Sequence, residues 1–335
     1  MGEILVTGAT GFIGSHLVEH LLELGESVRC LVRKTSNLKN IIGLDVEIVE
    51  GDIINPESLD KAVRGVDCVY HLANIIDRPD VSLTTYRFNN VQGSKNLFEK
   101  CLEHNVGRIV YFSSIAAVGF YCFSGSQGQV KPVDETVPCH PVTPYGISKY
   151  ETEQLALSLH REKGLPVVIL RPPTVFGPRE EYATSELFKA IAKGRFRIIG
   201  DGENLMSFSY VRNITHAAIL ASKSPVAIGR IYFVGDERAY KLKEIASTIA
   251  EEIGVELSRM HIPPRLAWIA GATLEVAGMI LGFQPPLSRR RVWTLTHSYA
   301  YDISRAKREL NYSPIYTLRE GVRLTVEWLR SMKYI

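Results

Sequence analysis

The sequence predicts an α/β fold with a doubly wound parallel sheet, followed by a smaller α+β substrate lobe. Over about the first half of the 335 residues, short apolar runs alternate with amphipathic helical segments, which is typical of a parallel sheet with helices on both faces. Beyond Pro172 this alternation loosens. We therefore expect a sheet domain over 1–173 and mainly a second lobe over 174–335, with parts of 207–234 folding back on the first domain.

The elements follow in order from local signals. A strand, a glycine-rich turn and a helix open the chain, and a second strand is predicted at 27–32. Asn55-Pro56 supplies an N-cap and a proline at the first helical position. Further strands are predicted at 46–50, 67–72, 108–113, 167–170, 196–199 and 229–234, and helices at 56–65, 84–104, 143–163, 184–193, 212–223, 242–253 and 317–331. Thr317 and Glu320 form a capping box for the last helix.

The opening turn reads Thr7-Gly8-x-x-Gly11-x-x-Gly14. Glycine permits a tight turn, a close approach of phosphate to the backbone, and close packing of helix on strand. The following helix N-terminus offers free N–H groups to an anion. The alternative is an ordinary strand-to-helix turn, but the strand–turn–helix–strand context favours a nucleotide cofactor and hence a Rossmann domain.

Composition narrows the class of protein. The hydrophobic fraction is 45% and the net charge is +3, so a large core is expected and nucleic acid is not an expected partner. Five cysteines are scattered without a C-x-x-C pair, which predicts neither a disulfide framework nor a metal site. A strand from residue 3 leaves no room for a signal peptide. We therefore expect a reducing, cytoplasmic setting.

Two cations suggest which nicotinamide cofactor is preferred. Arg33 and Lys34 follow the second strand, where enzymes that use NAD usually carry an acid for the ribose hydroxyls. A guanidinium would pair with a 2′-phosphate instead. We predict NADP(H) over NAD(H), with NAD(H) and a merely solvated basic loop as alternatives.

Tyr145 and Lys149 are the candidate acid–base pair. They lie four residues apart on a predicted helix and therefore share one face. A free tyrosine has a pKa of about 10, and a nearby ammonium favours the phenolate. Ser114, at the end of the fifth strand, could hold a substrate oxygen against Tyr145, whereas Ser113 is expected to cap the strand end. The alternative for the pair alone is a surface helix.

Taken together, these motifs resemble the extended short-chain dehydrogenase/reductase family, also called the NAD-dependent epimerase/dehydratase family. The matching motifs are the glycine turn, Gly51-Asp52-Ile53, His71-Leu72-Ala73, Asn90-Val91-x-Gly93, Ser113-Ser114, Tyr145-x-x-x-Lys149, Arg171-Pro172-x-x-Val175-x-Gly177-Pro178 and Tyr301-Asp302-x-x-x-Ala306-x-x-x-Leu310.

The resemblance implies the functional residues and a homodimer. Ser114, Tyr145 and Lys149 would be catalytic, and Asn90 would steady the active-site backbone. The implied cofactor contacts are Gly8, Thr10, Gly11, Phe12, Ile13, Gly14, Arg33, Lys34, Asp52, Ile53, Leu72, Ala73, Asn90, Tyr145, Lys149, Pro172, Thr174 and Val175.

The branch of the family is less sharply defined. Sugar-nucleotide epimerases carry an arginine for the substrate diphosphate where this chain has Met206. Met206, Phe208 and Tyr210, with the loop aromatics Phe120, Tyr121 and Phe123, suit an apolar substrate better. The chain looks closest to 3β-hydroxysteroid dehydrogenases and dihydroflavonol-4-reductases. A nucleotide-sugar epimerase or dehydratase with tightly bound NAD is the alternative, and a non-catalytic cofactor-binding sensor is a third.

One apolar stretch, 266–283, is interrupted only by Thr273 and Glu275 and is soon followed by three arginines. A membrane span needs about 20 apolar residues and would not favour a central glutamate. Three interpretations stay open: a buried helix of the second lobe, which the sequence favours, a helix resting on a membrane surface, and a span.

Overall fold

The structure, a computed structural model, describes residues 2–119, 130–282 and 287–335. Its centre is a parallel sheet of seven strands among the described residues, in the order β11-β6-β5-β4-β1-β2-β3. The strands are β1 (Glu3–Thr7), β2 (Ser27–Val32), β3 (Glu47–Glu50), β4 (Val66–His71), β5 (Arg108–Phe112), β6 (Val167–Arg171) and β11 (Ile231–Phe233). The predicted parallel sheet is confirmed.

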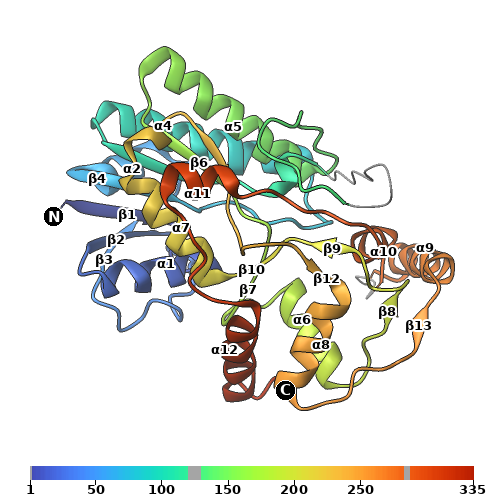
Figure 1. Ribbon diagram of the computed structural model, residues 1–335. Coiled ribbons are helices and arrows are strands. Elements are labelled where there is room, and N and C mark those ends of the chain that lie inside the picture. Colours follow the sequence, from blue (N-terminus) through green and yellow to red (C-terminus); the bar gives the residue numbers. More distant parts are fainter. Residues whose placement is uncertain (1, 120–129, 283–286) are drawn as a thin grey trace.

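Helices cover both faces of this sheet (Figure 1). In β1, Ile4 and Val6 join a core that includes α1 (Phe12–Glu23) and α7 (Val211–Lys223). Leu5 points to the other face, where α2 (Pro56–Val63), α4 (Gly93–Glu103) and α5 (Pro144–Lys163) pack. The alternation follows from the two-residue period of a strand. The doubly wound architecture is therefore confirmed at the level of single side chains.

The edge strand β11 comes from the second half of the chain. It pairs in parallel with β6, with Ile231 opposite Ile169 and Phe233 opposite Arg171. The sheet is therefore completed by a strand that begins at Ile231, whereas β6 ends at Arg171. The division of the chain at residue 173 stays a prediction.

The predicted continuous helix over 84–104 is corrected by the structure. It consists of α3 (Leu83–Tyr86), a π-helical segment (Arg87–Gln92) and α4. A π-turn adds a residue to the helical repeat and is often found where a side chain must be redirected. Here the segment carries the fully buried Asn90, whose side chain bonds to two other segments, as described below.

The second lobe is built from short elements, several of which the sequence analysis did not predict. Its strands pair as β7 with β10, β9 with β12, and β8 with β13. The strands are β7 (Thr174–Phe176), β8 (Ile198–Ile199), β9 (Leu205–Met206), β10 (Phe208–Tyr210), β12 (Tyr240–Lys241) and β13 (His261–Ile262). The helices are α6 (Ala183–Ala192), α8 (Leu242–Ile253), α9 (Pro264–Leu281), α10 (Arg289–Thr296), α11 (Ser304–Leu310) and α12 (Leu318–Ser331). The predicted capping box of Thr317 and Glu320 is confirmed.

Helix α9 lies at the far end of the second lobe, beside α10 (Figure 1). Among the described residues it is the one helix long and apolar enough to cross a membrane by length and composition, and only 17% of it is buried. The favoured interpretation of 266–283 as a buried helix is therefore wrong.

Candidate active site

The glycine turn is shaped by contacts that exclude side chains. Gly8 has a φ of +72°, and a Cβ there would lie 2.8 Å from the backbone nitrogen of Ala73. A Cβ at Gly14 would lie 2.1 Å from the carbonyl oxygen of Gly8. These positions therefore bring β1, the start of α1 and the chain after β4 into close backbone contact, which leaves a cradle beside the helix N-terminus.

That N-terminus is open to an anion. Gly11 is the N-cap of α1 and supplies no side chain to the first-turn N–H groups, which have no partner within the helix. The turn is held from outside, since the Asn40 side chain donates to the Thr10 carbonyl oxygen at 2.9 Å. Phe12 and Ile13, in the first turn, are part-exposed. The arrangement fits a pyrophosphate at the start of α1.

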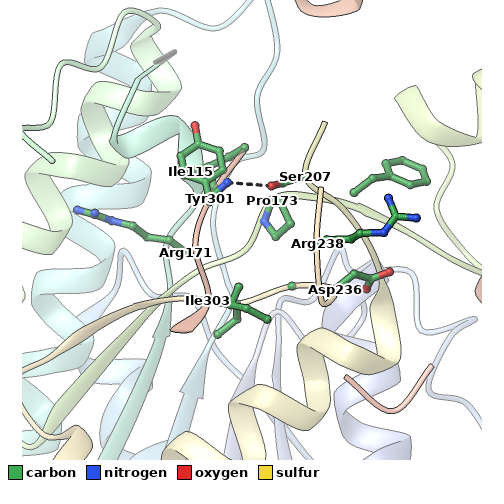
Figure 2. Close-up of a pocket in the computed structure, with 11 residues that line it drawn as sticks. Ile115, Arg171, Pro173, Ser207, Asp236, Arg238, Tyr301 and Ile303 are labelled. Carbon is green, nitrogen blue, oxygen red and sulfur yellow. Dashed lines mark hydrogen bonds between the residues drawn. The ribbon is translucent and has the colours of Figure 1, made fainter. Parts of the chain in front are cut away.

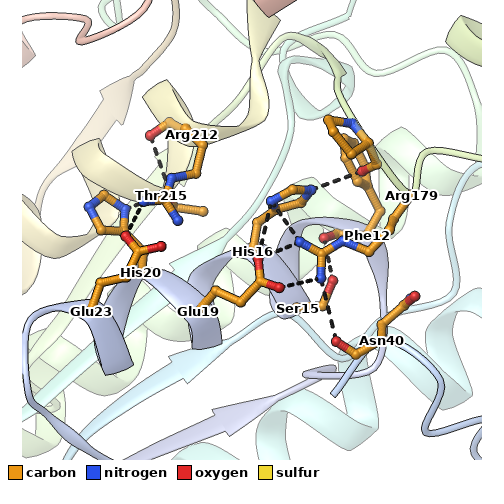
Figure 3. Close-up of polar contacts among 11 residues, drawn as sticks. Phe12, Ser15, His16, Glu19, His20, Glu23, Asn40, Arg179, Arg212 and Thr215 are labelled. Carbon is orange, nitrogen blue, oxygen red and sulfur yellow. Dashed lines mark hydrogen bonds and ion pairs between the residues drawn. The ribbon is translucent and has the colours of Figure 1, made fainter. Parts of the chain in front are cut away.

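A buried polar cluster braces the same helix (Figure 3). Arg179 forms an ion pair with Glu19 and donates to His16 Nδ1 at 2.9 Å and the Asn40 carbonyl oxygen at 3.4 Å. His16 Nε2 lies 2.9 Å from the Pro178 carbonyl oxygen. Burial, then the charge of Arg179, lowers the pKa of His16 to about 3. His16 is therefore neutral and ties α1 to the chain that follows β7.

The predicted adenosine-side residues lie at the ends of neighbouring strands. Arg33 and Lys34 follow β2 and are exposed, and neither side chain forms an ion pair in the described part of the chain. Asp52 Oδ1 accepts from the Ile54 backbone N–H at 3.1 Å, which shapes the turn after β3. Ile53 is buried against Gly93, where a Cβ would lie 2.7 Å from Ile53 Cδ1.

The structure brings Ser114, Tyr145 and Lys149 together. Ser114 follows β5, and its side chain lies close enough to Tyr145, in the first turn of α5, to lower the pKa of that phenol. The Lys149 ammonium lies 5.8 Å from the centroid of the Tyr145 ring and donates to the Phe112 carbonyl oxygen at 2.7 Å. The pair of side chains therefore faces inward to the carboxyl end of β5, and the alternative of a surface helix is wrong at these positions.

The electrostatics differ from the expectation for an isolated Tyr–Lys pair. Burial, then the charge of Asp77, raises the pKa of the Tyr145 phenol, and the neighbouring Ser114 side chain lowers it in part. Burial lowers the pKa of Lys149 to about 7, against an opposing effect of Glu153. The predicted acidification of Tyr145 by Lys149 is therefore reversed in direction, because both groups lose solvation together.

Asn90 connects the segment after β4 to the catalytic helix. Its Oδ1 accepts from the Ile75 N–H at 2.8 Å, and its Nδ2 donates to the Ile75 carbonyl oxygen and to Ser148 Oγ, both at 3.2 Å. Ser148 Oγ donates in turn to the Tyr145 carbonyl oxygen at 2.7 Å. Asn90 is therefore placed to fix backbone on both sides of Tyr145.

A second buried chain of hydrogen bonds, which sequence reasoning missed, runs from β1 to Asn90. Ser94 Oγ donates to the Asn90 carbonyl oxygen, so it must accept from His71 Nε2, 2.8 Å away. His71 Nδ1 then accepts from Thr7 Oγ1 at 2.8 Å, and Thr7 Oγ1 accepts from the Ala73 N–H at 3.2 Å. Each hydroxyl has one proton, which fixes a single direction along the chain.

Two polar side chains that follow β4 and β5 have no hydrogen-bond partner among the described residues. The Asn74 amide is buried, and neither its oxygen nor its nitrogen has a hydrogen-bond partner among the described residues. Ser113 Oγ is buried and likewise without a partner there, so the expectation that Ser113 caps the strand end is wrong. Ser114 performs that task, since its Oγ accepts from the Ala116 N–H at 3.1 Å. The unpaired buried amide of Asn74, directly after Ala73, fits a polar ligand beside the glycine turn.

The remaining predicted cofactor residues follow β6. The Pro172 carbonyl oxygen accepts from the Ile115 N–H at 3.1 Å, which places Pro172 directly beside Ser114. Thr174 and Val175 are part-buried in β7 and pair with Phe208 and Ser209 of β10. The two segments thus bring the start of the second lobe to the carboxyl edge of the sheet.

Comparison with known proteins identifies this arrangement. A family model described as the NAD dependent epimerase/dehydratase family matches residues 4–235. The chain belongs to this family. Together with the dehydrogenase-named relatives below, this match makes it an NAD(P)-dependent dehydrogenase/reductase of the extended short-chain type that acts on a small molecule.

Individual family members resemble the chain over nearly its whole length. A 3β-hydroxysteroid-dehydrogenase/decarboxylase of Arabidopsis thaliana is 30% identical and covers 98% of this chain and 80% of its own. A 2-alkyl-3-oxoalkanoate reductase of Stenotrophomonas maltophilia is 28% identical over 96% of this chain and 97% of its own.

Solved structures of the family have the same fold. The crystal structure of gox2253 is 30% identical, covers all of both chains and gives a TM-score of 0.83. A UDP-glucose 4-epimerase of Thermotoga maritima is 26% identical over 99% of both chains, with a TM-score of 0.76.

A small cavity lies near the site, and it is too small to hold a substrate. It has a volume of about 10 Å³ and is lined by Ile115, Arg171, Pro173 and Asp236, among others (Figure 2). Arg171 is bidentate to Glu153, at 2.9 and 2.6 Å, and its Nη1 has no partner among the described residues. The cavity has room for about one water molecule.

Of the aromatic residues predicted to favour an apolar substrate, two are buried in the core of the second lobe and three lie in a segment that the structure does not describe. Phe208 stacks on Phe176 at 4.4 Å between ring centroids, and Tyr210 packs against Tyr316 and Gly321. These two side chains, like Met206, are buried in the lobe. Phe120, Tyr121 and Phe123 lie outside the described residues.

Proposed function

We propose that this enzyme uses NADP(H) to interconvert a secondary alcohol and a ketone on an apolar, steroid-like, flavonoid-like or lipid-like skeleton. One observation carries the proposal. The Ser114 side chain lies beside the Tyr145 phenol at the carboxyl end of β5 and lowers its pKa, and the buried Lys149 ammonium lies behind the Tyr145 ring. Two hydroxyls that meet in this way can hold one carbonyl oxygen between them.

Each residue has a defined task in this reaction. A bound nicotinamide supplies or accepts the hydride. Ser114 orients the substrate oxygen, and Tyr145 donates a proton to it during reduction or removes one during oxidation. Lys149, held by the Phe112 carbonyl oxygen, supplies positive charge behind the phenol when it is protonated. The cradle at Gly8 and Gly14 and the unpaired Asn74 amide fit the dinucleotide.

The relatives support the substrate class. Their names specify a 3β-hydroxysteroid, a sterol-4-alpha-carboxylate and a 2-alkyl-3-oxoalkanoate. Each of these molecules carries a hydroxyl or a ketone on an apolar skeleton. Met206, where the alternative nucleotide-sugar substrate would need a cation for its diphosphate, supports the same choice.

The test is Tyr145→Phe, with Tyr150→Phe in the same helix as the matched control. We expect Tyr145→Phe to lower kcat by about 10²- to 10⁴-fold and to leave NADPH binding intact. Turnover is followed as NADPH absorbance with a 3-oxosteroid, a 2-alkyl-3-oxoalkanoate and UDP-glucose. Normal turnover in Tyr145→Phe contradicts the proposal. So does purified protein that retains NAD and epimerises UDP-glucose without added cofactor.

The preference for NADP(H) rests on the two free cations after β2. Arg33→Asp would place a carboxylate where a 2′-phosphate must bind, and would offer an acceptor to the ribose hydroxyls of NAD instead. We expect the ratio of kcat/KM for NADPH over NADH to fall by at least about tenfold, the effect of one charge-assisted pair. Lys39→Asp, at an exposed lysine already paired with Glu181, is the control. An unchanged ratio in Arg33→Asp contradicts the preference.

The homodimer and the cytoplasmic setting stay predictions. The contact of 266–283 with a membrane is taken up next.

A further inference from the structure

Helix α9 exposes its large apolar side chains to solvent, whereas a helix of a protein core would bury them. The residues that it buries are Ala267, Gly271 and Gly278. At 3.6 residues per turn, Ile269, Val276 and Ile280 lie on the opposite side, and they are 58%, 56% and 77% exposed. A surface helix of a water-soluble protein normally shows the reverse pattern. We call this opposite side, with the exposed Trp268 and Met279 beside it, the outer face.

Small residues on the inner side allow α10 to pack closely. A Cβ at Gly271 would lie 3.0 Å from the backbone carbon of Ser288 and 3.1 Å from the nitrogen of Arg289. Ala267 joins Val292 of α10 and Ile199 of β8 in a small apolar cluster. Helix α9 is therefore packed closely against α10 through its inner side. We call α9 and α10 together the hairpin. The exposure of its outer face is not a result of loose packing.

Charge around the hairpin selects an anionic occupant. From Arg259 to Arg291 the chain carries five arginines and one acidic residue, Glu275. The whole chain has a net charge of only +3, so the rest of the protein is slightly acidic. Arg289 lies over the ring of Trp268, with 5.9 Å between its guanidinium carbon and the ring centroid. Exposed Trp and aliphatic side chains bordered by arginine are typical of helices that lie in a lipid interface.

The same contacts exclude a spanning helix. Arg289 pairs with Glu275 and packs at Gly271, near the middle of α9. If α9 crossed a bilayer, the start of α10, with its three successive arginines, would lie at the depth of the lipid tails. A helix lying in the interface keeps these charges at the level of the headgroups.

We propose that the outer face of α9, with the arginines around it, docks the protein peripherally on membranes that contain acidic phospholipids. The hairpin is also fixed to the cofactor domain, because Arg290 pairs with Asp77 in the segment after β4. The proposal does not depend on the substrate or on the cofactor preference.

Vesicle co-sedimentation tests the proposal. Full-length protein is mixed with phosphatidylcholine vesicles with and without phosphatidylserine. We expect binding to the anionic vesicles and at least about a tenfold loss of partitioning in a double variant, Ile269→Ser with Ile280→Ser. The matched control, Ile42→Ser with Val226→Ser, removes two side chains that are 76% and 54% exposed and lie outside α9, and should bind like the wild type. Added salt should weaken the binding.

The other outcomes overturn the proposal. These are no pelleting with anionic vesicles, equal loss in both double variants, or a pellet that resists salt and alkaline carbonate, which would indicate a span. A lipid-free dimer that only the outer-face variant disrupts would assign the face to a second copy of the chain. Circular dichroism of each variant shows that it is folded, so a failure here is separate from a failure of the proposed reaction.

Discussion

The Lys149 side chain is almost completely buried from solvent. It is 3% exposed, and the structure offers its ammonium the Phe112 carbonyl oxygen and two aromatic rings. Burial lowers its pKa to about 7, so near neutral pH its charge responds to any group that binds beside it. An anionic ligand in the cleft would restore the ammonium and with it the positive charge behind Tyr145.

This pKa makes stability depend on pH in a defined direction. An unfolded lysine has a pKa of about 10.4, so between that value and about 7 the unfolded state binds more protons. Stability therefore rises with pH across this window. Relative to Lys149→Met, the wild type should gain about 3 kcal/mol of unfolding free energy between pH 7 and 9.5. Urea unfolding at both pH values measures this.

The control is Lys163→Met, which removes an exposed lysine from the last turn of the same helix. A difference between wild type and Lys149→Met that is constant with pH would show that Lys149 keeps an ordinary pKa in the folded protein.

At this scale the sequence predicts which residues meet but not what surrounds them. The four-residue spacing of Tyr145 and Lys149 was enough to place them on one face. Their pKa values depend on burial by β5 and on Asp77, which no local pattern reveals. The roles of Asn74 and His71 were missed for the same reason, since their neighbours are distant in sequence.

Among the elements, the glycine turn is the most constrained. A methyl group at Gly14 would lie 2.1 Å from the Gly8 carbonyl oxygen, and backbone on both sides leaves it no room. We expect Gly14→Ala to displace the start of α1 from its anion cradle, weakening NADPH binding by at least about tenfold and lowering stability by about 1–3 kcal/mol. Isothermal titration and thermal unfolding measure the two effects.

Gly107→Ala is the matched control. A Cβ at Gly107 would meet only the Asp67 carbonyl oxygen, at an ordinary 3.4 Å. If both variants bind NADPH like the wild type, the close approach at Gly14 does not shape the cradle.

Elements with local end signals were predicted well. Asn55 and Thr143 cap α2 and α5 through their side chains, and Thr317 closes the capping box of α12. The π-helical segment and the two-residue strands of the second lobe were not predicted. Their geometry depends on hydrogen bonds to residues in other segments, such as those of Asn90 to Ile75 and Ser148. The periodicity of the local sequence therefore does not predict them.

Across the whole molecule, Asn213 joins three parts of the chain. From α7, its Oδ1 accepts from the N–H groups of Ile315 and Tyr316, both at 2.9 Å. Its Nδ2 donates to Asp236 at 2.7 Å and to the Tyr316 carbonyl oxygen at 2.8 Å. The side chain is fully buried, and all four of its hydrogen-bonding positions are used.

Replacing Asn213 should therefore be costly. Asn213→Ala leaves two backbone N–H groups, one backbone carbonyl oxygen and one carboxylate oxygen of the buried Asp236 without this partner. We expect a loss of about 2–4 kcal/mol in unfolding free energy. Chemical denaturation measures it, with the exposed Asn37→Ala as control. A loss below about 1 kcal/mol would mean that water replaces the side chain.

The position of β11 has a consequence for synthesis. During synthesis, β6 leaves the ribosome well before β11, which begins at Ile231. Until β11 has been made, one edge of β6 has unpaired backbone N–H and C=O groups that can pair with another chain. A fragment that ends near residue 173 should therefore aggregate or bind a chaperone. A fragment that continues past Phe233 contains β11, which can pair with β6.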